Sequence, residues 1–120
     1  MKVRRSERLK DKKSSLAKYE KVEDFWHSQR REGDVVVGRV STEDKENFLE
    51  YVLKDNVMDM IHTYVSPARR GQRLAGKIVR AGFKLAVRRE WKIRPSCTYI
   101  SKTFLPRSEG KWSAHIASSL

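Results

Sequence analysis

A strand, a basic loop and an amphipathic helix follow one another between Val57 and Arg89, and this order constrains the fold more than any other feature. Val57–Val65 is mostly apolar on both faces, which predicts a strand in the interior of a sheet. Gln72–Arg89 repeats apolar residues at helical spacing. The connection between them contains Gly71 and a cluster of arginines, which predicts a short surface loop at the start of the helix.

Shorter patterns on both sides of this unit predict the rest of the fold. Apolar runs bounded by polar turn residues predict strands at Val35–Val40, Asn47–Leu53 and Ser96–Ile100. Ser101–Leu105 is expected to start a short helix that Pro106 stops, and Trp112–Ser118 is expected to form a last turn or helix. Three strands, one long helix and a fourth strand predict an α+β domain with the helix packed on a largely antiparallel sheet.

The first 32 residues differ in composition from the remainder of the 120-residue chain. Met1–Glu32 is rich in charged residues and poor in apolar ones, which predicts a basic, flexible arm with a short helix around Leu16–Trp26. Residues 33–120 then form a single domain. The arm is either a solvated tail or a segment that contacts nucleic acid or directs the chain to the nucleus.

Net charge and cysteine content restrict the partners and the compartment. A net charge of +12 requires an anionic partner or a basic tail. The single cysteine excludes an internal disulfide and a multi-cysteine zinc cage, so we expect no metal, and it fits a reducing cytoplasmic or nuclear compartment. Ser118–Leu120 resembles a peroxisomal address but lacks its basic middle residue. No apolar run is long enough for a membrane span, so we expect no membrane contact, and we expect a monomer or a weak dimer.

The start of the predicted helix carries the wrong charges for its own stability. A helix N-terminus has unpaired backbone N–H groups and a partial positive charge, and it is stabilised by acidic residues. Here Arg69, Arg70 and Arg73 surround it instead, each unfavourable by about 0.3–1 kcal/mol at the surface. An anion at this position would explain the charges, and phosphate is the commonest such ligand. An ordinary strand-to-helix turn with exposed arginines is the alternative.

These residues resemble the acetyl-coenzyme A loop of the GNAT superfamily of N-acetyltransferases. The similarity is closest to a minimal single-domain branch that includes a small plant acetyltransferase and animal N-acetyltransferase domain-containing proteins. The similar stretches, in chain order, are Thr42–Asp44, Phe48–Tyr51, Val57–Asp59, His62–Val65, Arg70–Gly71, Leu74–Ala75, Pro95–Tyr99 and Thr103–Arg107. They run from about Asp34 to Trp112 and imply a GNAT-like mixed, largely antiparallel sheet, with one long helix after the loop and a short C-terminal helix.

The resemblance also implies how acetyl-coenzyme A is bound. The strand before the loop and the strand that carries Cys97 would splay apart, with the pantetheine arm between them. The backbone of Thr63, Tyr64 and Val65 would hydrogen-bond that arm. The pyrophosphate would be held by Arg69, Arg70, Gly71, Gln72, Arg73, Leu74 and Ala75. On the other side of the cofactor the resemblance places Ser101, Lys102, Thr103 and Phe104.

Two positions depart from the superfamily pattern: Ala68 stands at the first place, where the pattern has Gln or Arg, and Arg73 stands at the last. Arg73 stands where the pattern, Gln/Arg-x-x-Gly-x-Gly/Ala, has a residue without a large side chain. The guanidinium either pairs with phosphate or blocks its approach. We favour pairing, because a guanidinium matches the geometry of phosphate oxygens.

Cys97 and His62 are the candidate catalytic residues. In the resembled branch a cysteine at this place lies near the thioester, and a cation such as Arg94 or His62 would be needed to activate it. A small buried filler is the alternative for Cys97. His62 is expected on the same strand face as Met58, Met60 and Tyr64, as a general base or as a core histidine. The remaining acid–base candidates are the carboxylates of Asp59 and Glu50 and the hydroxyl of Tyr99.

The sequence therefore predicts an acetyl-CoA-binding N-acetyltransferase. Its acceptor would be an amine, either a protein lysine or N-terminus or a small molecule. The alternative is a catalytically inactive GNAT-fold module that binds RNA or another polyanion. That module would use the basic arm and the cationic stripe on one face of the long helix, made of Arg73, Lys77, Arg80, Lys84 and Arg88.

Overall fold

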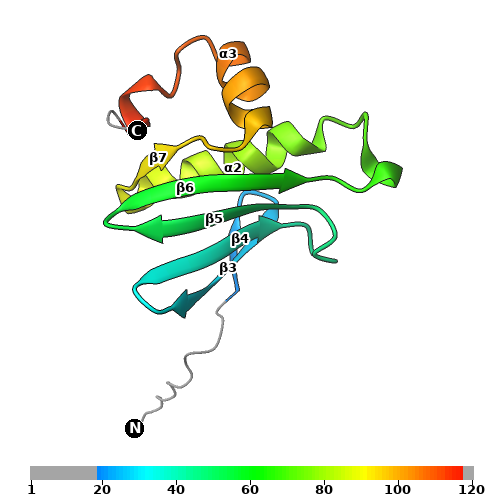
Figure 1. The fold of residues 1–120 in the computed structure, drawn as a ribbon. Helices are drawn as coiled ribbons and strands as arrows, with labels where there is room; N and C mark the ends of the chain where they lie inside the picture. Colours follow the sequence, from blue (N-terminus) through cyan, green and yellow to red (C-terminus); the bar gives the residue numbers. More distant parts are fainter. Residues whose placement is uncertain (1–18, 118–120) are drawn as a thin grey trace, which may run out of the picture.

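The computed structural model describes residues 19–117, which fold as a twisted sheet with a long helix across one face (Figure 1). The strands are β2 (Glu20–Val22), β3 (Phe25–Glu32), β4 (Val35–Ser41), β5 (Phe48–Lys54), β6 (Val57–Tyr64) and β7 (Lys92–Arg94). The helical segments are η1 (Pro67–Arg69), α2 (Leu74–Arg89), η2 (Ile100–Phe104), α3 (Leu105–Arg107) and η3 (Ser113–His115). No helix within these residues is both long enough and apolar enough to cross a bilayer.

In the described residues the sheet has the order β2-β3-β4-β5-β6-β7, and neighbouring strands are antiparallel except for the last pair. Hairpins join β2 to β6 in sequence, so these strands must alternate in direction. The helix α2 then carries the chain back along the sheet, so β7 pairs with β6 in parallel. The predicted fold class is confirmed: a mixed, largely antiparallel sheet with one long helix after the basic loop.

The helix α2 supplies most of one side of the core. Its buried residues, which face the sheet or, as Phe83 does, the C-terminal segment, are Leu74, Ile78, Val79, Ala81, Gly82, Phe83, Leu85 and Ala86. Gly82 allows close packing, because a Cβ built there would lie 2.4 Å from the side chain of Leu49. The opposite face of the sheet is not covered by a helix in the described residues, and Ile61 on β6 is 41% exposed. The sequence predicted a β6 strand buried on both faces, and this prediction was wrong for its second half.

The predicted N-terminal arm is wrong for Glu20–Glu32, which forms strands β2 and β3 rather than a flexible segment with a helix. Val22, Phe25 and His27 are buried beneath α2, whereas Glu23 and Asp24 are exposed and Trp26 is partly exposed. The sequence pattern did not reveal these strands, because strands near the edge of a sheet keep charged residues on their solvent side and the segment is therefore highly charged. The rest of the predicted arm, residues 1–18, lies outside the described residues, as do Ser118–Leu120.

The strand predicted at Ser96–Ile100 is also wrong. The strand β7 ends at Arg94, before Pro95, which has no N–H to donate to the sheet. The chain turns at Cys97 and is helical from Thr98 to Arg107. Pro106 does not stop this helix at the expected place. Pro106 lies in α3, which directly follows a π-helical turn over Ile100–Phe104. A proline is tolerated at the start of a new helical turn, because the N–H that it lacks has no acceptor there.

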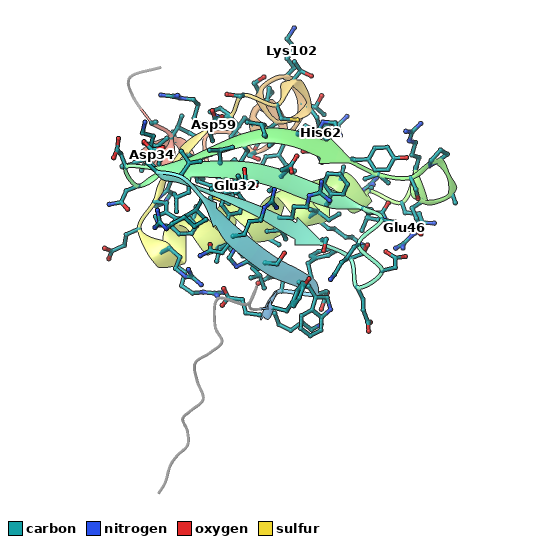
Figure 2. The ribbon with its side chains drawn as sticks, turned by 60° about the horizontal axis from the view of Figure 1, so that its bottom comes forward. Glu32, Asp34, Glu46, Asp59, His62 and Lys102 are labelled. Carbon is teal, nitrogen blue, oxygen red and sulfur yellow. The ribbon has the colours of Figure 1, made fainter. Side chains whose placement is uncertain are left out.

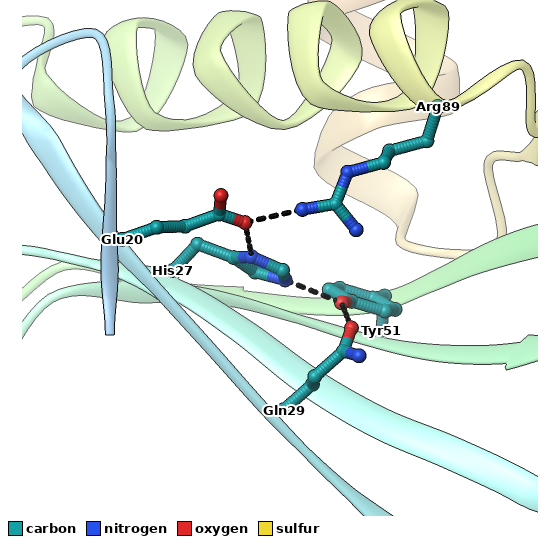
Figure 3. A network of polar contacts seen from close by, with 5 residues as sticks. All are labelled: Glu20, His27, Gln29, Tyr51 and Arg89. Carbon is teal, nitrogen blue, oxygen red and sulfur yellow. Dashed lines mark hydrogen bonds and ion pairs between the residues drawn. The ribbon is translucent and has the colours of Figure 1, made fainter. Parts of the chain in front are cut away.

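A buried polar network lies between the C-terminal end of α2 and the sheet (Figure 3). The His27 side chain is 3% exposed; its Nδ1 lies 2.8 Å from Glu20 Oε2 and its Nε2 2.6 Å from Tyr51 Oη. Arg89 pairs with Glu20, and Tyr51 Oη is 3.0 Å from Gln29 Oε1. Because tyrosine has one hydroxyl proton, a neutral His27 accepts it only when the Gln29 amide turns its NH₂ toward the tyrosine oxygen. The network thus links β2, β3 and β5 to the last turn of α2.

This network predicts a bell-shaped pH dependence of the free energy of unfolding. Burial lowers the pKa of folded His27 below its usual 6.5, so unfolding takes up a proton, and stability is lost, as the pH falls below that value. Burial raises the pKa of Tyr51 above its usual 10.0, so stability is also lost as the pH rises past it. Where one proton is exchanged, the slope is about 1.4 kcal/mol per pH unit. Urea unfolding followed by tryptophan fluorescence across this range measures both limbs.

The variant His27→Gln is expected to flatten the acid limb down to about pH 5, where carboxylates begin to titrate. Burial alone would raise the pKa of Glu20, but the hydrogen bond from His27 and the charge of Arg89 lower it overall, so its loss comes at more acid pH. His62→Gln is the matched control, because His62 is exposed and should leave the limb unchanged. An acid limb that persists in His27→Gln would contradict the assignment.

Candidate functional site

A β-bulge in β6 reorients the side chains that lead into the basic loop. Glu50 on β5 pairs with His62, but the next residue, Tyr51, pairs with Met60, so Ile61 is an extra residue on β6. An extra residue shifts the alternation of every side chain that follows it. His62 therefore does not share the buried face of Met60, as the sequence predicted. It is exposed on the open face of the sheet (Figure 2).

The aromatic neighbours of His62 confirm this orientation. The ring of Phe48 lies 6.0 Å from the ring of His62 and 5.9 Å from the ring of Tyr64. Tyr64 was likewise expected on the face of Met58 and Met60, and this prediction was wrong for the same reason. Thr63 takes the helix side instead, where its hydroxyl is 3.4 Å from the sulfur of Cys97.

The basic loop after β6 is held by specific hydrogen bonds. Asn47 is 1% exposed, and its side-chain oxygen accepts the N–H of Ser66 at 2.7 Å, which anchors the loop to the turn before β5. Arg70 donates from Nε to the carbonyl of Val65 at 3.0 Å, so its side chain curls back over the end of β6. Gly71 has a φ of +86°, a backbone conformation that favours glycine. These contacts fix the direction in which the loop enters α2.

The N-terminus of α2 is open to a ligand. Arg73 is its N-cap residue, with φ 60° and ψ 24°, and no side chain caps the helix. The first turn has no acidic residue, and the first helical N–H with a backbone acceptor is that of Lys77, which bonds to Arg73 O at 3.3 Å. The N–H groups of Leu74–Gly76 therefore have no intrahelical acceptor and carry the positive end of the helix dipole. This arrangement suits a phosphate or diphosphate.

A cavity of about 290 Å³ lies at this helix end. It is lined by Val65, Arg69, Arg70, Gly71, Arg73, Leu74, Ala75 and Tyr99. The first seven were predicted as cofactor-binding residues, and the fold brings them around one cavity. Gln72 is tied to its wall, because its side-chain oxygen accepts the Arg69 Nε hydrogen at 3.1 Å. Arg73 is both the N-cap residue of α2 and part of the cavity lining, so it is adjacent to the free helix amides.

A comparison with protein families gives the identity of this domain. A family model described as GCN5-related N-acetyl-transferase matches residues 38–115, well over half of the chain. The chain belongs to this family. Its members are acyltransferases, and GNAT domains generally bind acetyl-CoA. The match begins inside β4 and ends in η3, so it contains the bulge, the basic loop, α2 and the Cys97 turn.

The GNAT domain opens between β6 and β7 beside Cys97. The two strands pair only from Val57 to Asp59, and beyond this the Cys97 N–H donates to Met60 O at 2.8 Å. The thiol donates to Thr63 Oγ1, and Cys97 is 8% exposed. Cys97 therefore lies where the strands separate, as the resemblance implied, but in a turn rather than on a strand.

The structure does not bring the two candidate catalytic residues together. His62 lies on the open face, whereas the Cys97 thiol meets Thr63 on the helix side. Arg94 pairs in register with Asp59, whose side chain also faces away from α2. Neither of the cations expected to activate the thiol is on its side of the sheet. The catalytic roles of Cys97 and His62 remain predictions.

The helix after Cys97 contributes differently from the prediction. Ser101, Lys102, Thr103 and Phe104 were expected to flank the cofactor, but none of them lines the loop cavity. Lys102 points into solvent (Figure 2), and Phe104 packs against Phe83 with ring centroids 5.0 Å apart. Tyr99 takes the place beside the loop instead: a Cβ on Gly76 would lie 3.4 Å from its hydroxyl.

The position of Tyr99 depends on the helix that the sequence failed to predict. On the expected strand it would have shared a face with Cys97, whereas the helical turn directs it to the start of α2. Burial raises the pKa of Tyr99, against the lowering effect of Arg107, so its hydroxyl keeps its proton at neutral pH. The Tyr99 hydroxyl is therefore a hydrogen-bond donor at the edge of the loop cavity.

Proposed function

We propose that this GNAT domain binds acetyl-CoA at the basic loop and transfers its acetyl group to a primary amine. The observation that carries the proposal is the cavity at the uncapped end of α2, which combines free backbone N–H donors with two lining arginines, Arg69 and Arg73. A diphosphate has the negative charge and the acceptor oxygens that would pair with these donors. We accordingly assign Arg73 as a phosphate clamp rather than an obstruction.

The residues where β6 and β7 separate, and Tyr99 beside the loop, would hold the rest of the cofactor. Acetyl-CoA supplies an acetyl group activated as a thioester. The backbone of Thr63–Val65 would hold the pantetheine arm along the free edge of β6, beside the turn of Cys97. Tyr99 lines the loop cavity, and burial raises its pKa, so its protonated hydroxyl would donate a hydrogen bond to the cofactor there. Cys97 would have a structural role, because its N–H and its thiol donate hydrogen bonds to Met60 and Thr63 where β6 and β7 separate, and it would form no covalent intermediate.

Calorimetric titration with coenzyme A and acetyl-CoA tests the proposal. The wild type is expected to bind both, and Gly71→Glu is expected to weaken binding at least about ten-fold, which corresponds to roughly 1.4 kcal/mol. The new carboxylate would stand beside the pyrophosphate, and a Cβ there meets no atom within 4 Å, so the side chain fits sterically. A wild type that does not bind either ligand at about 1 mM would refute the proposal.

Gly33→Glu is the matched control for this experiment. Gly33 has a φ of +65° and Gly71 a φ of +86°, and neither has an atom within 4 Å of a built Cβ. Both substitutions therefore impose similar backbone strain and the same change of charge. Gly33 lies in the turn between β3 and β4, away from the cavity. Equal loss of binding in both variants would show a general effect on the fold instead of a contact with the cofactor.

A second function, binding of RNA or another polyanion, is favoured by the charge of α2. Arg73, Lys77, Arg80, Lys84 and Arg88 are all exposed on the helix. Of these side chains Lys84 has an acidic neighbour, Glu23, at 3.4 Å. Salt-dependent RNA binding that survives Gly71→Glu but is lost on replacing Lys77, Arg80 and Lys84 with glutamate would establish this function.

A further inference from the structure

A second cavity lies on the open face of the sheet, and none of its residues belongs to the loop cavity. Its volume is about 300 Å³, and it is lined by Val35, Val52, Lys54, Asp55, Val57, Asp59 and Arg94. These residues come from β4, β5, β6, β7 and the turn between β5 and β6. Figure 2 shows Asp59 on the face of the sheet that carries His62, toward the end where Asp34 lies.

Two of the side chains that line this cavity, of opposite charge and partly buried, each have one polar atom that lacks a partner. Asp59 and Arg94 are register partners on β6 and β7, so their side chains project to the same face. Asp59 Oδ1 and Arg94 Nε are both shielded from solvent, and neither has a hydrogen-bond partner among the described residues. Buried charged groups are normally paired, and leaving two such atoms unpaired is costly. A ligand that bonds both would remove this cost.

The chemistry of the two groups specifies the ligand. The Nε–H of arginine and a neighbouring N–H form a fork that binds a carboxylate with two parallel hydrogen bonds. A carboxylate such as that of Asp59 accepts hydrogen bonds from an ammonium group. Lys54 is already paired with Asp34 at 3.4 Å, at the rim of the cavity. The ligand therefore needs an ammonium and a carboxylate close together.

The other walls of the cavity are apolar. Val35, Val52 and Val57 come from three adjacent strands and are each partly buried, so they offer a hydrophobic surface next to the charged pair. A branched aliphatic side chain would gain by covering them. We propose that this cavity binds a free aliphatic amino acid, with its carboxylate on Arg94, its ammonium on Asp59 and its side chain on the valines.

The amino acid is the acetyl acceptor, a step that rests on the proposed function. Asp59 directly precedes Met60, whose carbonyl accepts the Cys97 N–H where β6 and β7 separate. An amine on Asp59 thus lies next to the cleft assigned to the pantetheine arm. The ammonium loses a proton, its nitrogen bonds the acetyl carbon, and the carbon–sulfur bond breaks. The products are the N-acetyl amino acid, the free thiol of coenzyme A and one released proton.

Titration of isotope-labelled protein, followed in the backbone amide spectrum without coenzyme A, tests the site directly. L-leucine is expected to shift the amides of Val57–Asp59 and Lys92–Arg94. Isopentylamine, which lacks the carboxylate, and isocaproate, which lacks the amine, are each expected to bind at least about ten-fold more weakly. No shifts at about 10 mM L-leucine would overturn the proposal.

Single substitutions separate the two contacts. Arg94→Gln is expected to remove the preference for L-leucine over isopentylamine, and Asp59→Asn the preference over isocaproate. Lys54→Gln is the control and should leave both preferences intact, because Lys54 lies at the rim with Asp34. If Arg94→Gln does not fold, Arg94→Lys keeps the charge but loses the bidentate fork, and it is expected to weaken L-leucine binding about ten-fold.

The outcome is distinguishable from the test of the proposed function. All four variants are expected to bind acetyl-CoA like the wild type in calorimetry, since their residues do not line the loop cavity. Acetyl-CoA binding without L-leucine binding would overturn this inference alone. L-leucine binding without acetyl-CoA binding would overturn the proposed function and the acceptor role. Unchanged preferences in Asp59→Asn and Arg94→Gln would show that the two charges bond each other instead.

Discussion

Replacement of Phe83 by alanine is expected to lower the free energy of unfolding by about 3–5 kcal/mol. Phe83 is fully buried on α2 and packs against two aromatic residues of the C-terminal part of the chain. Its ring centroid lies 5.0 Å from that of Phe104 and 5.2 Å from that of Trp112. Truncation removes both aromatic contacts and leaves a cavity that three different elements would have to close.

The same variant should also weaken acetyl-CoA binding, although Phe83 does not line the loop cavity. Tyr99 reaches the start of α2 from the helix that Phe104 fixes to Phe83, so a loosened helix would move the tyrosine. Urea unfolding and calorimetry measure the two effects. Phe48→Ala is the matched control: Phe48 is half-buried on the open face, and its loss should cost less stability and spare cofactor binding. An equal cost in both variants would contradict this role of Phe83.

Replacement of Gly38 by alanine is expected to cost about 1–3 kcal/mol, an unusual result for the addition of one methyl group. Gly38 on β4 pairs in register with Tyr51 on β5, and the tyrosine ring lies across the glycine. A Cβ at this position would lie 2.3 Å from the ring and the hydroxyl. The ring has little freedom to move, because its hydroxyl is bound to His27 and its other side meets Trp91. Urea unfolding measures the cost.

A double-mutant cycle with Tyr51→Ala isolates the steric contribution. In that background the ring is absent, so Gly38→Ala should become nearly neutral. Gly76→Ala is the positive control for glycine replacement in α2, because its Cβ would meet Tyr99 Oη at an ordinary 3.4 Å. It is expected to gain up to about 1 kcal/mol from helix propensity. If Gly38→Ala costs as much stability in the Tyr51→Ala background as in the wild type, the cost comes from the backbone and not from a clash with the ring.

Residues with strong local patterns were predicted correctly. The helix was expected over Gln72–Arg89 and is observed at Leu74–Arg89, because its apolar residues repeat without interruption over four turns. The arginine-rich loop was recognised from Gly71 and from charges that oppose the helix dipole. Seven of the predicted cofactor residues line one cavity for the same reason: they are close in sequence, so their proximity does not depend on distant parts of the chain.

The wrong predictions concern segments whose conformation depends on contacts with distant parts of the chain. Glu20–Glu32 is too charged to be recognised as strands, and it is ordered by β4 and by burial of Val22, Phe25 and His27 under α2. Cys97 lies in a run of β-formers, yet Pro95 ends the strand and the chain turns into a helix. His62 was placed on the wrong face because a bulge depends on the pairing of two strands and leaves no mark in the alternation of one.

The sequence alone indicated the family, through short motifs in a fixed order, and it predicted the strand–loop–helix unit and its cluster of positive charge, because each motif consists of residues close along the chain. Only the tertiary structure decided which side chains meet across the sheet. It separated His62 from Cys97, moved Tyr99 to the loop cavity and placed Asp59 beside Arg94, although 34 residues separate these last two. Register between strands is set by the whole sheet and the helix on it, so contacts of this kind follow from packing and cannot be read from local pattern.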